Sequence, residues 1–223
     1  MTADHATLDA IFAARHSCRA YLPKPVETVL IEQAVATAAR APSWCNAQPW
    51  QLLITSPDET ARLGAALHTH AQTHAMQPDL PWPASYSGVY KSRRFDCGMQ
   101  LYDAAGIPRE DKPARAAQML ENFRFFGAPH MALITSPAEL GAYGALDCGG
   151  FVTAFCAALG SLGLASIPQA APAGHATFLR DWFDLPQDRL ILCAISFGHA
   201  DSAAPLNRFR TPRAPLSEVI DWR

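Results

Sequence analysis

The sequence lacks most of the short motifs that identify an active site. It contains no GxxxxGK[ST] phosphate loop, no GxGxxG dinucleotide fingerprint, no GxSxG nucleophile turn and no HExxH zinc motif. No two of its six cysteines have the CxxC spacing that redox and zinc sites use. These absences argue against a P-loop NTPase, a Rossmann dehydrogenase, a serine hydrolase and a zinc protease.

Charge and hydrophobicity also limit the class of protein. The 223 residues carry 18 Lys and Arg against 20 Asp and Glu, so the net charge of −2 does not attract nucleic acid to the chain as a whole. We find no apolar stretch of about 18 residues and no basic segment before an apolar one at the N-terminus, and we expect neither a membrane span nor a signal peptide. The cysteines are expected to be reduced thiols in a cytoplasmic protein.

Segments with helical periodicity alternate with short apolar runs. The apolar runs QLLITS, HMALITS, ASIP and RLILCAISFG predict strands at 51–56, 130–136, 165–168 and 189–198. Helices are predicted at 5–14, 26–41, 58–75, 89–105, 110–124, 147–162 and 174–183. The alternation predicts an α/β or α+β fold. No shift in composition marks a boundary, so residues 1–223 are expected to form one domain, with 77–125 as a helical insert that can act as a lid.

The C-terminal segment, residues 204–223, is rich in Pro and Arg but ends in EVIDW. A loose tail has no need of Val219, Ile220 and Trp222, whose side chains favour strands. We therefore expect the tail to add a strand, on a neighbouring subunit. The helix at 147–162 is apolar on all sides, which predicts a central position.

The segment RHSCR places Arg15, Ser17 and Arg19 at alternate positions. In an extended chain alternate side chains point the same way, so all three can reach one ligand, and guanidinium groups bind phosphate through paired N–H donors. The alternative is a pair of surface arginines without a ligand. Arg210 and Arg213 repeat the pattern near the other end, so both ends of the chain can hold one phosphate.

The loop RAPSWCNAQPWQL, residues 40–52, is more polar and more aromatic than a simple connection requires. Ser43, Asn46 and Gln48 can hydrogen-bond the polar edge of a flat heterocycle, and the two prolines reduce the entropy cost of holding them in place. Trp44 either lies beside a ligand or packs against the protein. Phosphate donors and an amide-rich loop, without a Rossmann fingerprint, fit flavin mononucleotide (FMN).

The histidines of HTHAQTH offer an alternative chemistry. His70 and His74 are separated so that one helix face can present both to a metal ion. No nearby cysteine or carboxylate completes such a site, and a solvated helix surface explains the spacing. We therefore predict no metal site.

Four segments, taken together in chain order, resemble the nitroreductase family of FMN-dependent oxidoreductases. They are RHSCR at 15–19, APSWCNAQPW at 41–50, LGSLGLASIPQAAP at 159–172 and the FGHAD…RTPRAPLSEVI ending. Each is short, but together they span nearly the whole chain. The resemblance implies an α+β fold of the α/β/α type, with a mixed, mainly antiparallel sheet flanked by helices. It also implies a homodimer with exchanged C-terminal segments and FMN at the interface.

The resemblance further implies which residues bind the FMN phosphate. Arg15 and Ser17 would hold it, with His16 contributing mainly its backbone. Arg213 would complete the site, and Arg210 would assist.

For the isoalloxazine ring the resemblance implies three sets of contacts. Arg19 would lie near the pyrimidine edge, where a fixed cation stabilises the anionic reduced flavin. Residues 42–46 would contact the ring or the ribityl chain from the partner subunit, and residues 168–170 would pass along the ring and offer a backbone N–H to N5. The residues concerned are Pro42, Ser43, Asn46, Pro168, Gln169 and Ala170.

By the same resemblance, NADH or NADPH would reduce the flavin and leave, and a nitroaromatic or quinone acceptor would then be reduced in the same place. The cofactor carries this chemistry, so no catalytic side chain is required. Trp44, Tyr86 and Phe123 are candidates to contact the acceptor, and the alternative for each is a packing role. A rival interpretation is a flavin-binding carrier or sensor without turnover.

Overall fold

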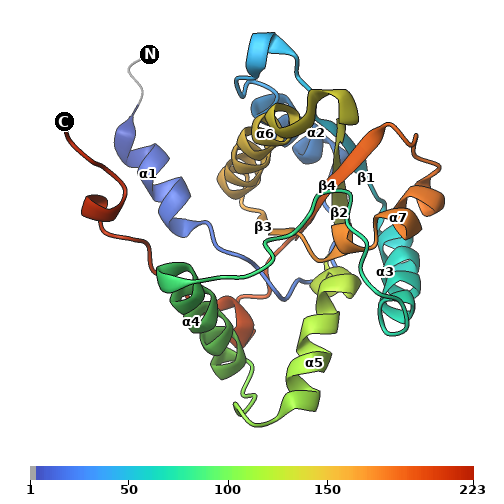
Figure 1. Ribbon diagram of the computed structural model, residues 1–223, viewed down its shortest axis with the longest axis vertical. Helices are drawn as coiled ribbons and strands as arrows, with labels where there is room; N and C mark the ends of the chain where they lie inside the picture. The colour runs from blue at the N-terminus through green and yellow to red at the C-terminus, as the bar shows by residue number, and fades with distance from the viewer. Residues whose placement is uncertain (1–3) are drawn as a thin grey trace.

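The protein folds into three layers, with a sheet between two sets of helices (Figure 1). The computed structural model describes residues 4–223. The α-helices are α1 (His5–Ala14), α2 (Thr28–Ala38), α3 (Pro57–Ala71), α4 (Gly88–Ala104), α5 (Lys112–Leu120), α6 (Gly141–Ser161) and α7 (Ala176–Phe183). The strands are β1 (Gln51–Ile54), β2 (His130–Pro137), β3 (Ala165–Gln169) and β4 (Arg189–Gly198). Short 3₁₀ helices are η1 (Trp44–Asn46), η2 (Glu121–Gly127), η3 (Ala138–Leu140), η4 (Pro172–Gly174), η5 (Pro205–Asn207) and η6 (Leu216–Glu218).

The sheet is antiparallel through its four strands, in the order β1-β2-β4-β3. Strands β2 and β4 form the centre and pair from His130 with Phe197 to Pro137 with Arg189. Strands β1 and β3 are the two edges. The expected α+β class with a mainly antiparallel sheet is confirmed.

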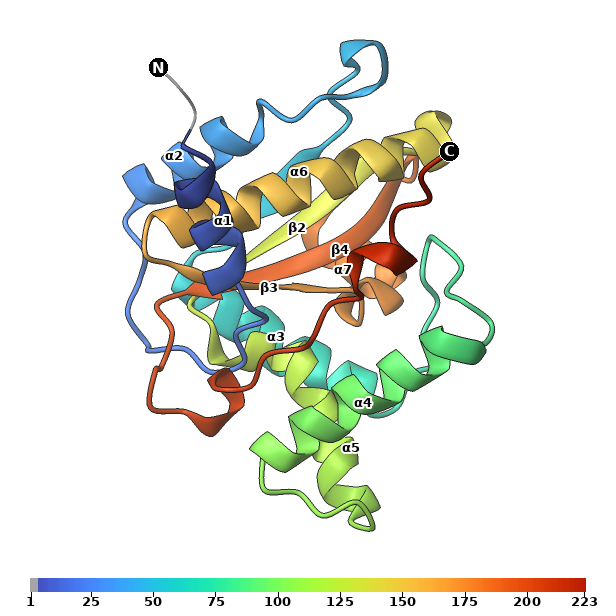
Figure 2. The same cartoon turned by 90° about the vertical axis from the view of Figure 1, so that its left-hand side faces the viewer.

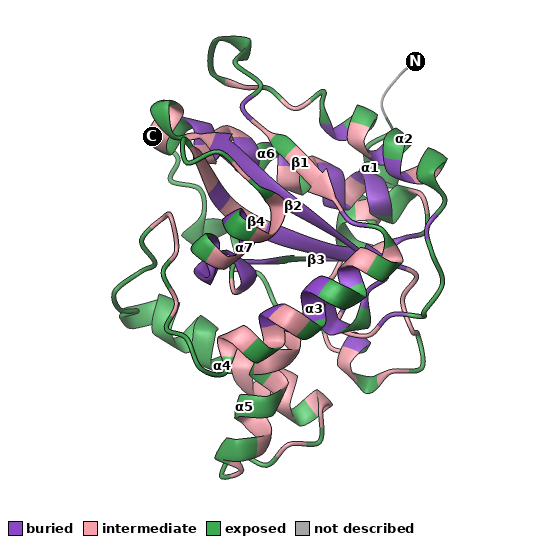
Figure 3. Cartoon of the chain, turned by 90° about the vertical axis from the view of Figure 1, so that its right-hand side faces the viewer, coloured by how far each residue is buried: buried purple, intermediate pink, exposed green. Residues whose placement is uncertain are grey.

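Helices cover both faces of the sheet, which explains why the central strands are unbroken apolar runs. Figure 2 shows α2 and α6 on one side of the sheet, and Figure 3, from the other side, shows α3 and α7 beside the buried strands. Successive residues of β2 point to opposite faces and so enter different cores. One core contains Ile31, Ile134, Phe151, Phe155 and Ile195, and the other contains Leu63, Leu67, Met131, Leu133 and Leu179.

Helix α6 begins earlier than its sequence pattern predicts. It starts at Gly141 rather than at 147, and Gly144 lets it approach β2, since a Cβ at Gly144 would lie 2.5 Å from the Ser136 Oγ. The segment Ala138–Ser161 is long and apolar enough by composition to cross a membrane, which the sequence analysis did not anticipate. It packs against α2, β2 and β3, and 39% of its most apolar 18-residue window is buried.

Helices α4 and α5 of the insert and the C-terminal segment bury few side chains. Neither α4 nor α5 contains a buried residue. The C-terminal segment passes α4, where the Arg93 Nη2 lies 2.6 Å from the Glu218 Oε2. No strand forms within residues 204–223, so the strand expected in the tail is absent from the single chain. Val219 and Trp222 are instead 69% and 87% exposed.

Candidate functional site

A cavity of about 270 Å³ lies where the two ends of the chain meet. It is bounded by the end of α1, the residues 15–19, α4 and the residues 209–213. Its lining consists of Phe12, Ala13, Arg15, His16, Ser17, Arg19, Cys97, Phe209, Arg210, Thr211 and Arg213. The arginines that the sequence singled out at opposite ends of the chain therefore share one cavity, which we call the terminal cavity.

The residues 15–19 are extended and lie against the edge of the sheet. Ser17 forms a parallel bridge with Ser166 of β3, and the Cys18 N–H donates to the Ser166 carbonyl at 3.2 Å. Cys18 is fully buried, whereas its neighbours Ser17 and Arg19 line the terminal cavity. This is the alternation that the RHSCR pattern predicts.

Asn207 fastens the C-terminal segment to the N-terminal one. Its Oδ1 accepts a hydrogen bond from the Arg19 backbone N–H at 2.7 Å, and its Nδ2 donates to the carbonyls of Ala20 and Asp201 at 2.8 and 2.9 Å. Asn207 is buried, so water does not compete for these bonds. Asn207 could not be identified from the sequence, because a single Asn in a polar segment carries no signal of a distant partner.

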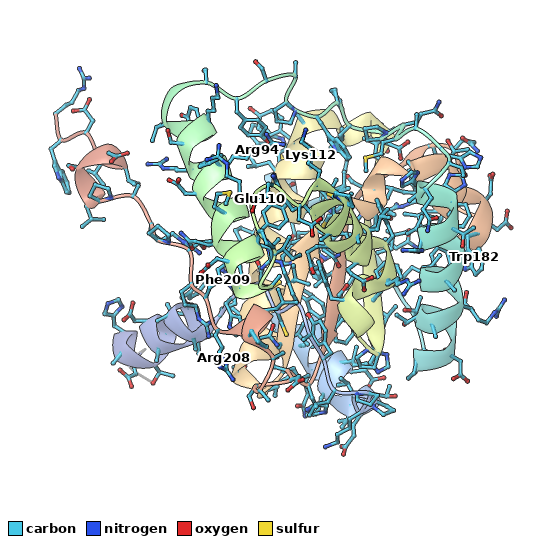
Figure 4. The ribbon with its side chains drawn as sticks, turned by 90° about the horizontal axis from the view of Figure 1, so that it is seen from below. Arg94, Glu110, Lys112, Trp182, Arg208 and Phe209 are labelled. Atoms are coloured by element: carbon cyan, nitrogen blue, oxygen red, sulfur yellow. The ribbon has the colours of Figure 1, made fainter. Side chains whose placement is uncertain are left out.

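The terminal cavity carries an excess of positive charge. Its lining includes four guanidinium groups and no carboxylate. Arg19 lies over the ring of Phe209, with its Cζ 5.4 Å from the ring centroid, where the C-terminal segment passes α4 (Figure 4). Burial lowers the pKa of Arg19 below its ordinary value. An anion would therefore be stabilised here by charge as well as by hydrogen bonds.

His16 lies in the same positively charged environment. Burial lowers the pKa of its imidazole, and the neighbouring arginines add to this effect. Its Nδ1 lies 3.1 Å from the Ala14 carbonyl, which can only accept a hydrogen bond. Its Nε2 is buried without a partner among residues 4–223. Because Nδ1 of the neutral imidazole then carries the hydrogen, Nε2 can only accept a hydrogen bond, and its partner must be a donor.

Strand β3 leads away from the terminal cavity along the edge of the sheet. Ser166 lies beside Ser17, and Ala170 is about 13 Å farther along at the usual rise of a strand. Pro168 and Ala170 are exposed, whereas the Gln169 side chain is buried. A ligand with its phosphate in the terminal cavity has an exposed strip of β3 along which to lie.

The loop at residues 40–50 lies at the other end of α6. The Trp44 backbone N–H donates to the Asp147 Oδ2 at 3.0 Å, near the start of this helix. Arg15 instead shares a small cavity with Cys156, near the end of the helix. The structure therefore does not bring Pro42, Ser43 and Asn46 to the terminal cavity within one chain.

The same loop has an unusual backbone. Cys45, Asn46 and Gln48 have φ values of 49°, 57° and 47°, in the left-handed region that costs free energy for residues with a Cβ. The Ser43 Oγ accepts a hydrogen bond from the Gln48 N–H at 3.0 Å and helps to hold this shape. Strained loops of this kind are concentrated at ligand sites.

Comparison with known proteins decides the family. A model described as the nitroreductase family matches residues 12–199. The chain belongs to the nitroreductase family. It is 34% identical over 212 residues to nitroreductase NfnB of Mycolicibacterium smegmatis, covering 95% of this chain and 90% of the relative. It is 32% identical over 205 residues to a 4-nitrobenzoate reductase of Pseudomonas putida, covering 92% of this chain and 90% of the relative.

Solved structures agree with this membership. The FMN-dependent nitroreductase NfnB from Mycobacterium smegmatis, in complex with NADPH, superposes with a TM-score of 0.93 at 33% identity, covering 99% of this chain and 100% of that one. The FMN- and NADPH-dependent nitroreductase NfnB from Sphigopyxis sp. strain HMH superposes with a TM-score of 0.91 at 34% identity, covering 97% and 98%. The fold of this nitroreductase is therefore shown over nearly its whole length.

Trp44, Tyr86 and Phe123 are the aromatic candidates to contact an acceptor, with a packing role as the alternative for each. Trp44 is 63% exposed, and Tyr86 is 42% exposed beneath the guanidinium of Arg94. Phe123 is only 1% exposed and packs against the ring of His175, with 5.1 Å between the ring centroids. In this nitroreductase Phe123 is thus a core residue, with no surface to offer an acceptor, which corrects the expectation.

His70 lies in α3, and His74 follows just after the end of this helix. The rings of His70 and His74 stack on each other, with their centroids 3.9 Å apart. Among residues 4–223, no group of three or more His, Cys, Asp or Glu side chains is arranged to hold a metal ion.

Proposed function

We propose that this nitroreductase is an FMN-dependent oxidoreductase that takes electrons from NADPH or NADH and reduces nitroaromatic or quinone-type acceptors. The observation that carries the proposal is the basic terminal cavity, whose lining residue Ser17 is paired with Ser166 of β3. The relatives named as FMN- and NADPH-dependent nitroreductases and as 4-nitrobenzoate reductase support the choice of cofactor, donor and acceptor.

The FMN phosphate binds in the terminal cavity. Arg15, Ser17 and Arg213 hold it, and Arg210 lies beside them. The residues fit the group because four guanidinium groups and no carboxylate line the terminal cavity, which leaves hydrogen-bond donors in excess. A phosphate supplies the missing acceptors and the missing negative charge.

Residues 168–170, at the end of β3 and the position after it, would hold the flavin ring. Pro168 has no backbone N–H, so a main-chain donor to the ring comes from Gln169 or Ala170. Arg19 provides the cation at the pyrimidine edge, and its backbone is fixed by Asn207. A second wall of the site comes from the partner subunit, through its copy of the loop that carries Pro42, Ser43 and Asn46.

When bound, FMN supplies two-electron redox chemistry between a nicotinamide and an acceptor that occupy the same place in turn. The chain's own residues bind, orient and exclude water. The guanidinium groups of the terminal cavity anchor the phosphate, and Pro168 and Ala170 cover one side of the ring. Trp44 and Tyr86 are exposed aromatic surfaces on which a flat acceptor can stack. No acid–base pair is required of the side chains.

The functional unit is a homodimer in the cytoplasm, in which residues 1–223 form one domain and the insert at 77–125 acts as a lid. Large apolar side chains are exposed on α1, on α6 and in the tail of the single chain. They are Leu8, Phe12, Tyr143, Leu146, Leu216, Val219 and Trp222. A patch of this composition suits an interface between copies of the chain. Deleting residues 204–223 and measuring the mass of the assembly tests the role of the tail.

An anaerobic spectrum of the purified protein tests the function. We expect a yellow protein whose flavin bands bleach when NADPH is added and return when 4-nitrobenzoate or a quinone follows. Parallel lines in double-reciprocal plots would support two half-reactions at one site. A yellow protein that keeps its colour with both nicotinamides would instead be a carrier or sensor, and a colourless protein that cannot be loaded with FMN would refute the proposal.

A further inference from the structure

The Gln169 side chain is a polar group in the protein core, at the end of β3. It is 4% exposed, and all of its hydrogen-bonding atoms are engaged. Its Nε2 donates to the backbone carbonyl of Asn122 at 3.0 Å and to the Asn122 Oδ1 at 3.2 Å. Its Oε1 accepts from the hydroxyl of Ser196, a fully buried residue of β4. A buried amide that is satisfied on both sides has one stable orientation.

The chemistry of the partners fixes which way the amide points. A backbone carbonyl can only accept, so the atom that faces the Asn122 carbonyl must be the NH₂ group of Gln169. The carbonyl oxygen of the amide then faces Ser196, whose hydroxyl must donate. We call this chain of hydrogen bonds the Gln169 anchor.

The Gln169 anchor joins three parts of the molecule. Ser196 lies in the central strand β4, Gln169 is the last residue of β3, and Asn122 lies in η2, where the chain returns from the insert. The main-chain pairing of β3 with β4 ends with Gln169 opposite Ala194. The pairing with β4 does not continue past Gln169 before the chain enters the buried turn η4 (Pro172–Gly174).

The face opposite the anchor is the one that the cofactor uses. Pro168 and Ala170 flank Gln169 and are exposed, because adjacent residues of a strand point to opposite sides. A side chain fixed in the core therefore determines where the backbone of residues 168–170 stands on the exposed side. A shift of that backbone would change how it meets the flavin ring.

We propose that Gln169 is a positioning residue, whose anchor to Ser196 and Asn122 holds the backbone of residues 168–170 in register with the FMN ring. This inference rests on the proposed FMN site. It assigns Gln169 a role through its side chain that is separate from any contact of its backbone with the cofactor. It also links the insert to the cofactor, because Asn122 moves with η2.

The first test replaces Ser196 with Ala and uses Ser136→Ala as the matched control. Ser136 is equally buried, in β2 of the same sheet, but its hydroxyl lies beside Gly144 and not beside Gln169. In the protein without FMN, hydrogen exchange of the peptide spanning 165–174 should accelerate roughly tenfold in Ser196→Ala and stay unchanged in the control. In the FMN-loaded protein, the midpoint potential of the flavin should shift in Ser196→Ala only.

The second test replaces Gln169 with Glu. An ionised carboxylate has no hydrogen to donate to the Asn122 carbonyl, whereas a protonated one has. We compare the hydrogen-exchange rate of the peptide 165–174 in Gln169→Glu with that of the parent at the same pH. The ratio of the two rates should be large at neutral pH and approach one as the pH is lowered. A substitution that only disturbed packing would change the ratio by the same factor at every pH.

The outcomes separate this inference from the proposed function. If Ser196→Ala binds FMN with unchanged exchange at 165–174 and an unchanged potential, the positioning role is refuted and the FMN site stands. If exchange accelerates but the potential does not move, the anchor is structural only, and the role toward FMN is likewise refuted. A parent protein that cannot bind FMN refutes the proposed function and the positioning role together.

Discussion

Replacing Arg15 with Ala removes one guanidinium group from the terminal cavity at little cost to the fold. The Arg15 side chain forms no ion pair within residues 4–223. It is only partly buried, so its loss leaves no buried charge without a partner. The expected effect is therefore on ligand binding and not on the free energy of unfolding.

The size of the effect follows from the type of bond. A hydrogen bond between a charged donor and a charged acceptor contributes about 1.5–3 kcal/mol, and about 1.4 kcal/mol corresponds to a tenfold change in Kd. Arg15→Ala should thus weaken FMN binding by about ten- to a hundredfold. Riboflavin carries the same ring without the phosphate, so its affinity should change little.

Fluorescence titration of the protein without cofactor measures both affinities. Arg213→Ala should behave like Arg15→Ala. The matched control is Arg208→Ala, because Arg208 lies in the same C-terminal segment but outside the lining of the terminal cavity, where its Nη2 donates to the Ala203 carbonyl at 2.8 Å (Figure 4). An equal loss of affinity for FMN and riboflavin, or unchanged FMN binding in both cavity variants, would show that the phosphate does not bind there.

Three further predictions concern the fold. Gly144→Ala places a methyl group 2.5 Å from the Ser136 Oγ and should lower the free energy of unfolding by about 1–3 kcal/mol in urea titrations; an unchanged midpoint would contradict the close approach of α6 to β2. Asp79→Asn breaks a buried ion pair of 2.6 Å with Arg180 and should cost about 3–5 kcal/mol by the same measurement, so a loss below about 1 kcal/mol would mean that the pair is solvated. Burial lowers the pKa of His175 from its ordinary 6.5, so the folded state disfavours its protonated form. The contribution of His175 to the free energy of unfolding is fully present above pH 6.5 and is lost as the pH falls through the lowered pKa. His175→Gln should flatten that decline, and an equal decline in parent and variant would assign it to other groups.

Local patterns predicted the elements of the fold well, because their causes are local. The helix expected at 5–14 is α1, and the run RLILCAISFG is β4 with the same bounds. The early start of α6 could not be predicted, since Gly141 and Gly144 are poor helix formers and the reason for Gly144 is a contact with another strand. Tertiary packing overrides propensity at such positions.

The candidate site was predicted in part for the same reason. Residue type and alternation identified the cationic lining of the terminal cavity. They gave no indication that Phe123 is turned into the core, or that the side chain of Gln169 is held there by Ser196. Nor does sequence show that Pro42 lies far from the cavity in its own chain, because that distance depends on the length and direction of α6.

Asn207 has a consequence for the order of events in the cell. By holding the C-terminal segment against the residues after α1, it makes the anion site a product of the earliest and the latest parts of synthesis. Arg15 leaves the ribosome early in synthesis, but the proposed phosphate site is incomplete until Arg213 has also been synthesised. With the proposed phosphate site, flavin loading is therefore a step that follows translation.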